Sequence, residues 1–192
     1  MGQVSKFAGA LSLDLVLNEL IANAGAKSGI NQFKFRVNLD LLNGTLDGQI
    51  DRVYAKSEDA IAASATTSYD LLGTLKDLSG NNILFAEVCL IAIRNKRSTA
   101  LATLIIGPHA TNGFGKLVAG RGFWGATADV SNGSGNVIQP NTAAGGDGWV
   151  ILYAPDGVPV ANGASDILAV VASAVAGDVN AYDIVIAGRS AA

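Results

Sequence analysis

The sequence has few of the side chains that usually carry chemistry. Of its 192 residues, 15% are charged, and it contains one histidine and one cysteine. Ordinary soluble domains have about 25% charged residues, so much of this surface must consist of small uncharged residues or lie hidden in an assembly. The net charge of -3 gives no overall attraction to nucleic acid. The composition favours a protein that acts through its shape and its contacts.

A single cysteine excludes an intrachain disulfide and any Cys-x-x-Cys zinc or redox motif. Cys89 lies in the apolar run Val88–Ile91, which predicts a small buried side chain. The chain also lacks a membrane-spanning or convincing targeting segment, because Asp14 and Glu19 interrupt the apolar stretch that begins at Phe7. We therefore expect no membrane partner.

No arrangement of residues predicts an enzyme. His109 follows Gly107-Pro108 in an expected loop, where a turn residue is favoured over a catalytic base. Ser134 has no Gly-x-Ser-x-Gly context, and the glycines near Lys116 have the wrong spacing for a phosphate-binding loop. We predict no catalytic residue and no cofactor.

The scattered carboxylates predict no metal site either. Asp147 and Asp156 precede glycines in expected turns, whereas Asp166 and Asp183 begin or interrupt expected strands. No Asp-x-Asp-x-Asp calcium loop occurs, and an acid and base pair of the glycosidase type has no support beyond these residues. Turn and strand roles explain them all.

Basic residues form one compact group, which consists of Arg94, Lys96 and Arg97. A solvated strand end is favoured here over a contact with phosphate or with an acidic partner. Residues 122–188 contain six Asp and neither Lys nor Arg. We expect no nucleic-acid partner.

What the sequence does have is a repeated alternation of apolar segments and turn pairs. Gly and Asn tolerate the positive φ of tight turns, and the 23 glycines are well above the usual share of about 7%. This pattern predicts an all-β protein, a β-sandwich of jelly-roll or Greek-key type. The turn pairs are Asn43-Gly44, Asp47-Gly48, Ser79-Gly80, Asn112-Gly113, Asn132-Gly133, Asp147-Gly148, Asp156-Gly157 and Asn162-Gly163.

Several segments have the composition of strands. Residues 33–41 alternate between apolar and polar side chains, as in a half-buried antiparallel strand. Residues 83–93 are almost continuously apolar, which predicts a central strand buried on both faces. The predicted strands are residues 33–41, 52–56, 60–63, 67–72, 83–94, 100–106, 149–154, 167–171 and 181–187.

The N-terminal residues fit two interpretations. Leu11, Leu15 and Ile21 share one helical face, with Ser12 as a cap and Gly25 as a stop, which predicts a short helix. The alternation at Leu11, Leu13, Leu15 and Leu17 also fits an extended arm that pairs with a neighbour. We predict an N-terminal helix or arm over residues 1–29 and a β-sandwich domain over residues 30–192.

Residues 107–140 differ from the rest because they form a long polar stretch with large aromatic residues. A loop of this length in a compact domain is usually functional. Together with the leucines of the arm, it provides the candidate contacts with partners, which are Leu13, Leu15, Leu17, Phe114, Arg121, Phe123 and Trp124.

Several blocks, in a familiar order, resemble a group of virion structural proteins of tailed bacteriophages and prophages. The resemblance covers roughly residues 50–188 and is a pattern of strands and turns without a catalytic signature. The long loop and the N-terminal fifty residues depart from the group's pattern. The blocks are Ala63–Gly73, Leu75–Asn81, Ile91–Asn95, Trp149–Gly157 and Ala181–Gly188.

This resemblance implies a decoration or cement protein on the capsid, with a tail or fibre component as the alternative. It implies that the chain contacts the major capsid protein or other virion proteins and forms a homo-oligomer, with a trimer favoured. It also implies that the protein is made in the host bacterial cytoplasm and resides in the virion. Two further readings remain: a receptor- or glycan-binding module with Phe123, Trp124 and Tyr153 as an aromatic platform, and a small jelly-roll coat protein.

Overall fold

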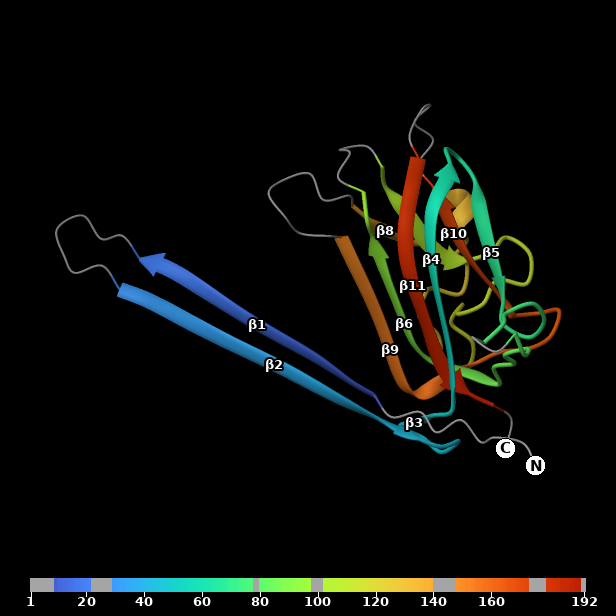
Figure 1. The fold of residues 1–192 in the computed structure, drawn as a ribbon, viewed down its shortest axis with the longest axis horizontal. Coiled ribbons are helices and arrows are strands. Elements are labelled where there is room, and N and C mark those ends of the chain that lie inside the picture. The colour runs from blue at the N-terminus through green and yellow to red at the C-terminus, as the bar shows by residue number, and fades with distance from the viewer. Residues whose placement is uncertain are drawn as a thin grey trace.

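The structure is a computed structural model that describes residues 9–21, 29–77, 80–97, 102–139, 148–172 and 179–190. For residues 9–21, 29–41 and 179, the description covers the backbone alone. These residues form strands in three sheets, and the only helical element described is a 3-10 turn, η1 (Val130–Asn132). Figure 1 shows two of the sheets packed as a sandwich, which confirms the predicted all-β sandwich.

Each sheet of the sandwich has four antiparallel strands. The first has the order β4 (Arg52–Ala62), β11 (Val179–Arg189), β6 (Glu87–Asn95) and β9 (Gly148–Pro159). The second has the order β5 (Thr66–Asp70), β10 (Ile167–Ala172), β7 (Leu104–Pro108) and β8 (Asn136–Ile138).

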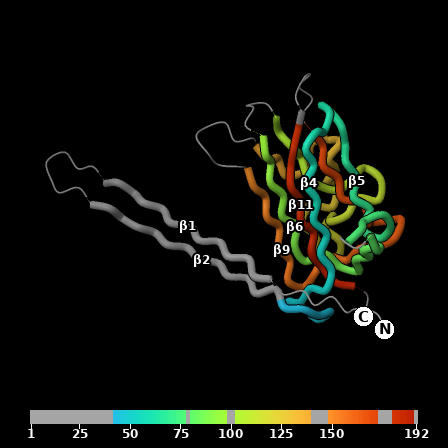
Figure 2. The backbone as a smooth tube through the Cα atoms, in the orientation of Figure 1, coloured from blue at the N-terminus to red at the C-terminus, as the bar shows by residue number. Residues whose placement is uncertain are grey.

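The strands pair in a nested order. β7 pairs with β8, β6 with β9, β5 with β10, and β4 with β11. Strands from opposite ends of the domain therefore lie side by side, as the blue-green β4 and the red β11 do in Figure 2.

The core fills the space between the two sheets. Ile91 and Ile93 of β6 and Ile184 and Ile186 of β11 are almost completely buried there, opposite residues such as Leu104 of β7. Alternate residues of a strand point to opposite faces, which explains this spacing. Burying each such side chain stabilises the fold by roughly 1.5–3 kcal/mol.

β6 confirms the prediction of a strand buried on both faces. Val88, Ile91 and Ile93 belong to the core, whereas Cys89 and Leu90 belong to a second buried cluster. The strand itself begins at Glu87, so residues 83–86 lead into it without being part of it. A β-bulge at residues 88–90 changes the register with β9.

Other predicted strands differ in extent. The two short segments at 52–56 and 60–63 form one strand, β4, and the segment at 149–154 continues to Pro159 as β9. β8 lies in the stretch that was predicted as a long loop. The predicted turns are confirmed at five glycines with φ between 67° and 153°, which are Gly44, Gly48, Gly80, Gly133 and Gly163. The turn predicted at Asp156-Gly157 is wrong, because Gly157, although its φ is 71°, lies inside β9.

The N-terminal helix prediction is wrong: residues 9–21 are extended, as in the alternative, but they pair with residues 29–41 of the same chain. β1 (Gly9–Ile21) and β2 (Gly29–Asn43) are antiparallel strands, and β3 (Gln49–Ile50) adds to β2 in a separate three-stranded sheet (Figure 1). β2 offers β1 a partner strand with the same alternation of apolar and polar residues. Pairing with β2 stabilises the extended strand, whose side chains repeat every two residues, over a helix. The predicted division after residue 29 falls inside β2, after its first residue, and it separates two strands that pair with each other.

Candidate assembly interface

β1 and β2 form a hairpin with one face made of large apolar residues. In the register, Leu13 lies opposite Val37, and Leu15 lies opposite Phe35. Alternate residues of paired strands share a face, so the apolar face consists of Leu11, Leu13, Leu15, Leu17, Phe33, Phe35, Val37, Leu39 and Leu41. The opposite face carries polar pairs such as Asp14 with Arg36.

Within the described residues, this hairpin has no sheet partner in the sandwich. β1 pairs with β2 alone, and β2 pairs with β1 and β3. An isolated two-stranded hairpin is only marginally stable in water. A hairpin with a continuous apolar face therefore needs a surface to cover it, and the predicted contacts Leu13, Leu15 and Leu17 all lie on that face.

A tight turn fixes the root of the hairpin. The Gly44 N–H donates to the Ile50 carbonyl at 3.1 Å, and the Gly48 N–H donates to the Pro155 carbonyl of β9 at 3.1 Å. Gly44 has φ +153°, and a Cβ there would lie 1.9 Å from Oε1 of Gln49, so the turn requires glycine. Leu42 and Asn43 pair with β3 in parallel. These contacts fix the C-terminal end of β2 and therefore the direction in which the hairpin leaves the turn.

Ile50 anchors this root to the sandwich. It is almost completely buried against the side of the first sheet that faces away from the core, which we call the outer face. Its neighbours there are Cys89, Leu90, Ala187, Val53 and Tyr153.

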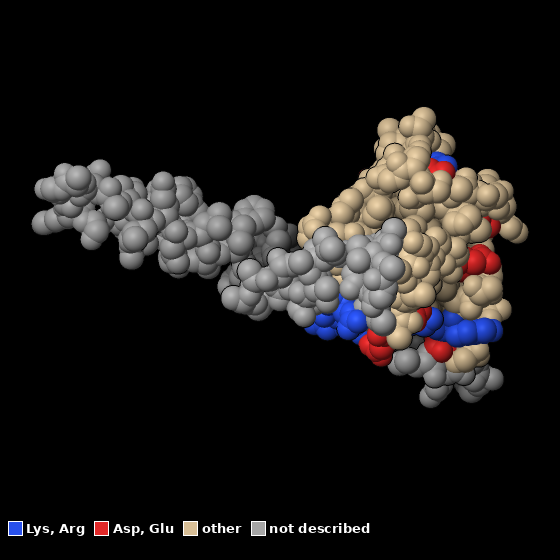
Figure 3. All heavy atoms as spheres, turned by 90° about the horizontal axis from the view of Figure 1, so that it is seen from above, with Lys and Arg blue, Asp and Glu red and all other residues tan. Residues whose placement is uncertain are grey.

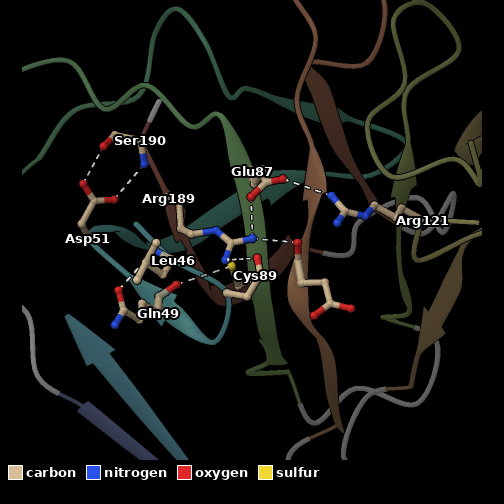
Figure 4. Close-up of polar contacts among 10 residues, drawn as sticks. Leu46, Gln49, Asp51, Glu87, Cys89, Arg121, Arg189 and Ser190 are labelled. Atoms are coloured by element: carbon tan, nitrogen blue, oxygen red, sulfur yellow. Dashed lines mark hydrogen bonds and ion pairs between the residues drawn. The ribbon is translucent and has the colours of Figure 1, made fainter. Parts of the chain in front are cut away.

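A buried arginine ties the root to three strands (Figure 4). The side chain of Arg189 is 2% exposed. Its Nη1 donates to Oδ1 of Asp47 in the turn at 3.0 Å, and its Nη2 donates to Oε2 of Glu87 at 2.5 Å and to the Asp156 carbonyl at 2.7 Å. Charge-assisted bonds of this kind are the stronger ones in proteins. The turn is thereby joined to β6, β9 and β11.

Neighbouring charges keep Arg189 ionised. Burial alone would lower its pKa, but the carboxylates of Glu87 and Asp47 raise the pKa above its ordinary value. Burial raises the pKa of the Cys89 thiol, which lies 3.9 Å from the Gln49 carbonyl. A protonated, buried thiol has little reactivity, so the prediction of a buried structural cysteine is confirmed.

Sequence reasoning missed Asp47, Glu87 and Arg189 as a group. One signal was available. Arg189 is the first basic residue after the long stretch without Lys or Arg, and it directly follows an apolar strand. A buried charge must be paired, so a single basic residue at such a position indicates that carboxylates from elsewhere in the chain form ion pairs with it.

The aromatic residues of the long loop are part of the core. Phe114 is fully buried, Trp124 is 8% exposed, and Phe123 is half-buried against the same core cluster. Phe123 packs edge-on against both neighbours, with ring centroids at 6.2 Å and 5.7 Å. The indole Nε1 of Trp124 donates to Oδ1 of Asn136 at 2.9 Å. Phe114 and Trp124, which were predicted as contacts with partners, are therefore core residues, because the segment folds back over the sandwich.

Arg121 is the one residue predicted in this loop whose side chain is largely exposed. Its Nη1 donates to Oε1 of Glu87 at 3.2 Å, on the oxygen that Arg189 leaves free. Arg121 is thus the solvent-exposed member of the ion-pair group that Arg189 forms with Glu87 and Asp47.

Arg94 and Lys96 of the basic group that was predicted as a solvated strand end are paired with carboxylates. Arg94 donates two hydrogen bonds to Asp183, at 2.7 and 3.1 Å, and Lys96 contacts Asp59 at 2.5 Å and Asp183 at 3.2 Å. In Figure 3 the charged atoms lie mostly along one side of the sandwich, next to a broad uncharged surface. These pairs neutralise Arg94 and Lys96.

Chemical sites are not evident in the described part of the chain. No group of three or more His, Cys, Asp or Glu residues there could hold a metal ion. The ring Nδ1 of His109 lies within hydrogen-bond distance of the backbone of Thr111, as in a turn. Among the same residues, no helix is long and apolar enough to cross a membrane. Asp147 lies outside the described residues.

Comparison with protein families, with curated proteins and with solved structures finds no match to this chain.

Proposed function

We propose that this chain is a structural protein of a bacteriophage particle, a decoration or cement protein that binds the major capsid protein and bridges capsid subunits. The observation that carries the proposal is the amphipathic hairpin, which has no sheet partner in the described sandwich and whose root is held by buried contacts. An extended segment of this kind lets a subunit add contacts to a neighbour without disturbing its own core.

The order in which the strands of the sandwich pair supports the same role. We propose that it is a jelly roll, because the nested pairs β7–β8, β6–β9, β5–β10 and β4–β11 fit eight strands folded as two Greek keys. Jelly rolls occur in viral capsid domains, lectins and cupins. Apolar side chains such as Ile91, Leu104 and Phe114 fill the space between the sheets, which favours a shell component over a ligand-holding cupin.

The resemblance of residues 50–188 to phage virion proteins supports a place on the capsid surface. In this proposal the protein is made in the bacterial cytoplasm and assembles as a homo-oligomer, with a trimer favoured, and neither nucleic acid nor membrane is a partner. The receptor- or glycan-binding alternative loses its main support because Trp124 is buried.

A small jelly-roll coat protein is the second candidate. The nested strand pairing favours it as much as it favours a decoration protein. Expression of the chain alone separates the two, because a coat protein forms closed shells that electron microscopy detects, whereas a decoration protein forms small oligomers.

The test of the main proposal uses particles released by cells that carry the gene. After density-gradient purification, mass spectrometry is expected to find the chain in the particles. Particles from cells that lack the gene are expected to release their DNA at a lower temperature, and restoring the gene should reverse this. Absence of the chain from purified particles would reject the proposal.

A further inference from the structure

We infer that the outer face of the first sheet is the docking site for the β1–β2 hairpin of a second copy of this chain. The inference deepens the proposed function and rests on it, since it names the partner through which a particle subunit would assemble.

The outer face consists of rows that cross the four strands. The first row is Val53, Ala187, Leu90 and Tyr153, and Ile50 at the hairpin root covers it. The second row is Ala55, Val185, Ala92 and Ile151. Both rows are apolar, so an uncovered apolar strip continues directly from the covered one.

Nothing in the described chain covers the far end of this strip. Ile151 is 40% exposed. A third row follows, which consists of Ser57, Asp183, Arg94 and Trp149, and Trp149 is 55% exposed. Ala55 and Ala92 are small, and a shallow hollow lies beside Ala55, lined also by Lys56, Ser57, Asp183, Ile184 and Val185. Ala92, on the inner strand β6, leaves room beside Ile151 for another sheet to pack closely.

The third row limits the strip on one side. The Arg94 guanidinium lies 5.6 Å from the centre of the Trp149 ring and bonds to Asp183. The charges of this row are thus neutralised within it, so the face presents an apolar strip with a paired polar border and no net charge that would repel a second copy.

The hairpin has the complementary features. By its register, Leu11, Leu13, Leu15 and Leu17 of β1 share the apolar face, and among the described residues β1 pairs with no strand other than β2. β1 has 13 residues, whereas β11 at the centre of the sheet has 11. Each residue of a strand adds about 3.3 Å, so the hairpin is longer than the strands of the sheet and can extend across it.

A second copy is the occupant because the hairpin's own root works against folding back. Leu42 and Asn43 pair with β3, and the Gly44 N–H bonds to Ile50. Docking on the same chain would require breaking these contacts, whereas docking on a neighbour leaves them intact. Each copy offers one hairpin and one outer face, so copies can exchange hairpins, and we infer an assembly of the closed, symmetric kind that most soluble oligomers form.

Light scattering on the full-length protein tests this inference. Wild type is expected to form a closed oligomer at micromolar concentration. Ile151→Glu on the outer face and Leu15→Glu on the hairpin are each expected to weaken association about tenfold or more, because a charge would be buried at the interface. The matched controls are Val137→Glu, an exposed apolar position in β8, and Val16→Glu, on the opposite hairpin face. They are expected to change association less than about twofold.

Disulfide trapping identifies the two surfaces even if a glutamate variant unfolds. In a Cys89→Ala background, one chain carries Leu15→Cys and another carries Ile151→Cys. With oxidised glutathione, the mixed disulfide is expected to exceed the yield of the control pair Val16→Cys and Ile151→Cys. Equal yields would overturn the inference, as would a disulfide within one doubly substituted chain.

A monomeric wild type, or equal effects of all four glutamate variants, would also overturn it. The proposed function would still stand if the chain were found in particles. Conversely, an oligomer with the predicted disulfide in a chain that is absent from particles would reject the function alone.

Discussion

At the residue scale, the two tryptophans are expected to have opposite roles. Trp124 is 8% exposed within the core and Trp149 is 55% exposed on the outer face. Trp124→Ala is expected to lower the free energy of unfolding by about 3–5 kcal/mol, as aromatic truncations in cores do. Trp149→Ala is expected to lower it by less than about 0.5 kcal/mol while weakening association. Urea denaturation measures the first effect, and equal losses in the two variants would contradict the assignment of Trp124 to the core.

Arg189 is expected to stabilise the junction between hairpin and sandwich. Arg189→Met leaves Glu87 without its buried partner, at a cost of about 2 kcal/mol. This is less than the roughly 3–5 kcal/mol of a fully buried pair because the Glu87 side chain is 27% exposed. The control is Arg121→Met, which breaks an exposed contact with the same Glu87 and should cost less than about 1 kcal/mol. Similar unfolding midpoints for the two variants would show that burial of Arg189 contributes little.

Asp183 predicts a pH dependence of stability. Burial alone would raise its pKa, but hydrogen bonds from Ser57, Lys96 and Arg94 lower the pKa below its usual value. The carboxylate therefore stabilises the fold above its unfolded pKa of about 3.9, and this contribution is lost as the pH falls through the lower folded pKa. Asp183→Asn is expected to be less stable than wild type at neutral pH, and the difference should shrink below about pH 4. A difference independent of pH would show that the charge of Asp183 is not involved.

At the element scale, the hairpin is expected to serve association and not folding of the sandwich. Deleting residues 1–41 removes β1 and most of β2, which pair with no strand of the sandwich, and keeps Ile50 and the turn that holds it. The shortened chain should unfold cooperatively near the wild-type midpoint and lose self-association. Near-ultraviolet circular dichroism and light scattering measure the two properties. Loss of the cooperative transition would show that the hairpin is needed for the core.

The sequence predicted the elements whose apolar pattern is continuous. β6 and β11 are rich in β-branched residues and form the centre of the first sheet. β8 was missed because three residues, Asn136 to Ile138, are too few to show a period. For β1, the leucines fit both the helical and the strand spacing, and only the register with residues 33–41 selects the strand.

The candidate site was only partly predictable. The leucines of the arm were identified from their alternation, and the structure places them on one hairpin face. Phe114 and Trp124 were misplaced because the composition of a loop does not reveal whether it folds over the core. The outer face depends on registers between strands more than a hundred residues apart, such as Ala55 with Val185, and no local pattern contains that information.

At the scale of the whole molecule, the described residues combine a filled sandwich with two apolar surfaces. One surface is a hairpin face defined by register, and the other is an exposed strip that ends at Ile151 and Trp149. Large contiguous apolar patches on soluble proteins usually mark sites of interaction. In this account, the two surfaces cover each other when copies assemble.

Hydrogen–deuterium exchange tests this claim most directly, by comparing the assembled wild type with the Leu15→Glu variant at a concentration where that variant is monomeric. Assembly is expected to slow exchange together in residues 9–43 and in the outer strip at 149–151 and 183–185, while β5 and β8 of the other sheet stay unchanged. Slower exchange confined to other strands, or no difference between the two proteins, would contradict the account.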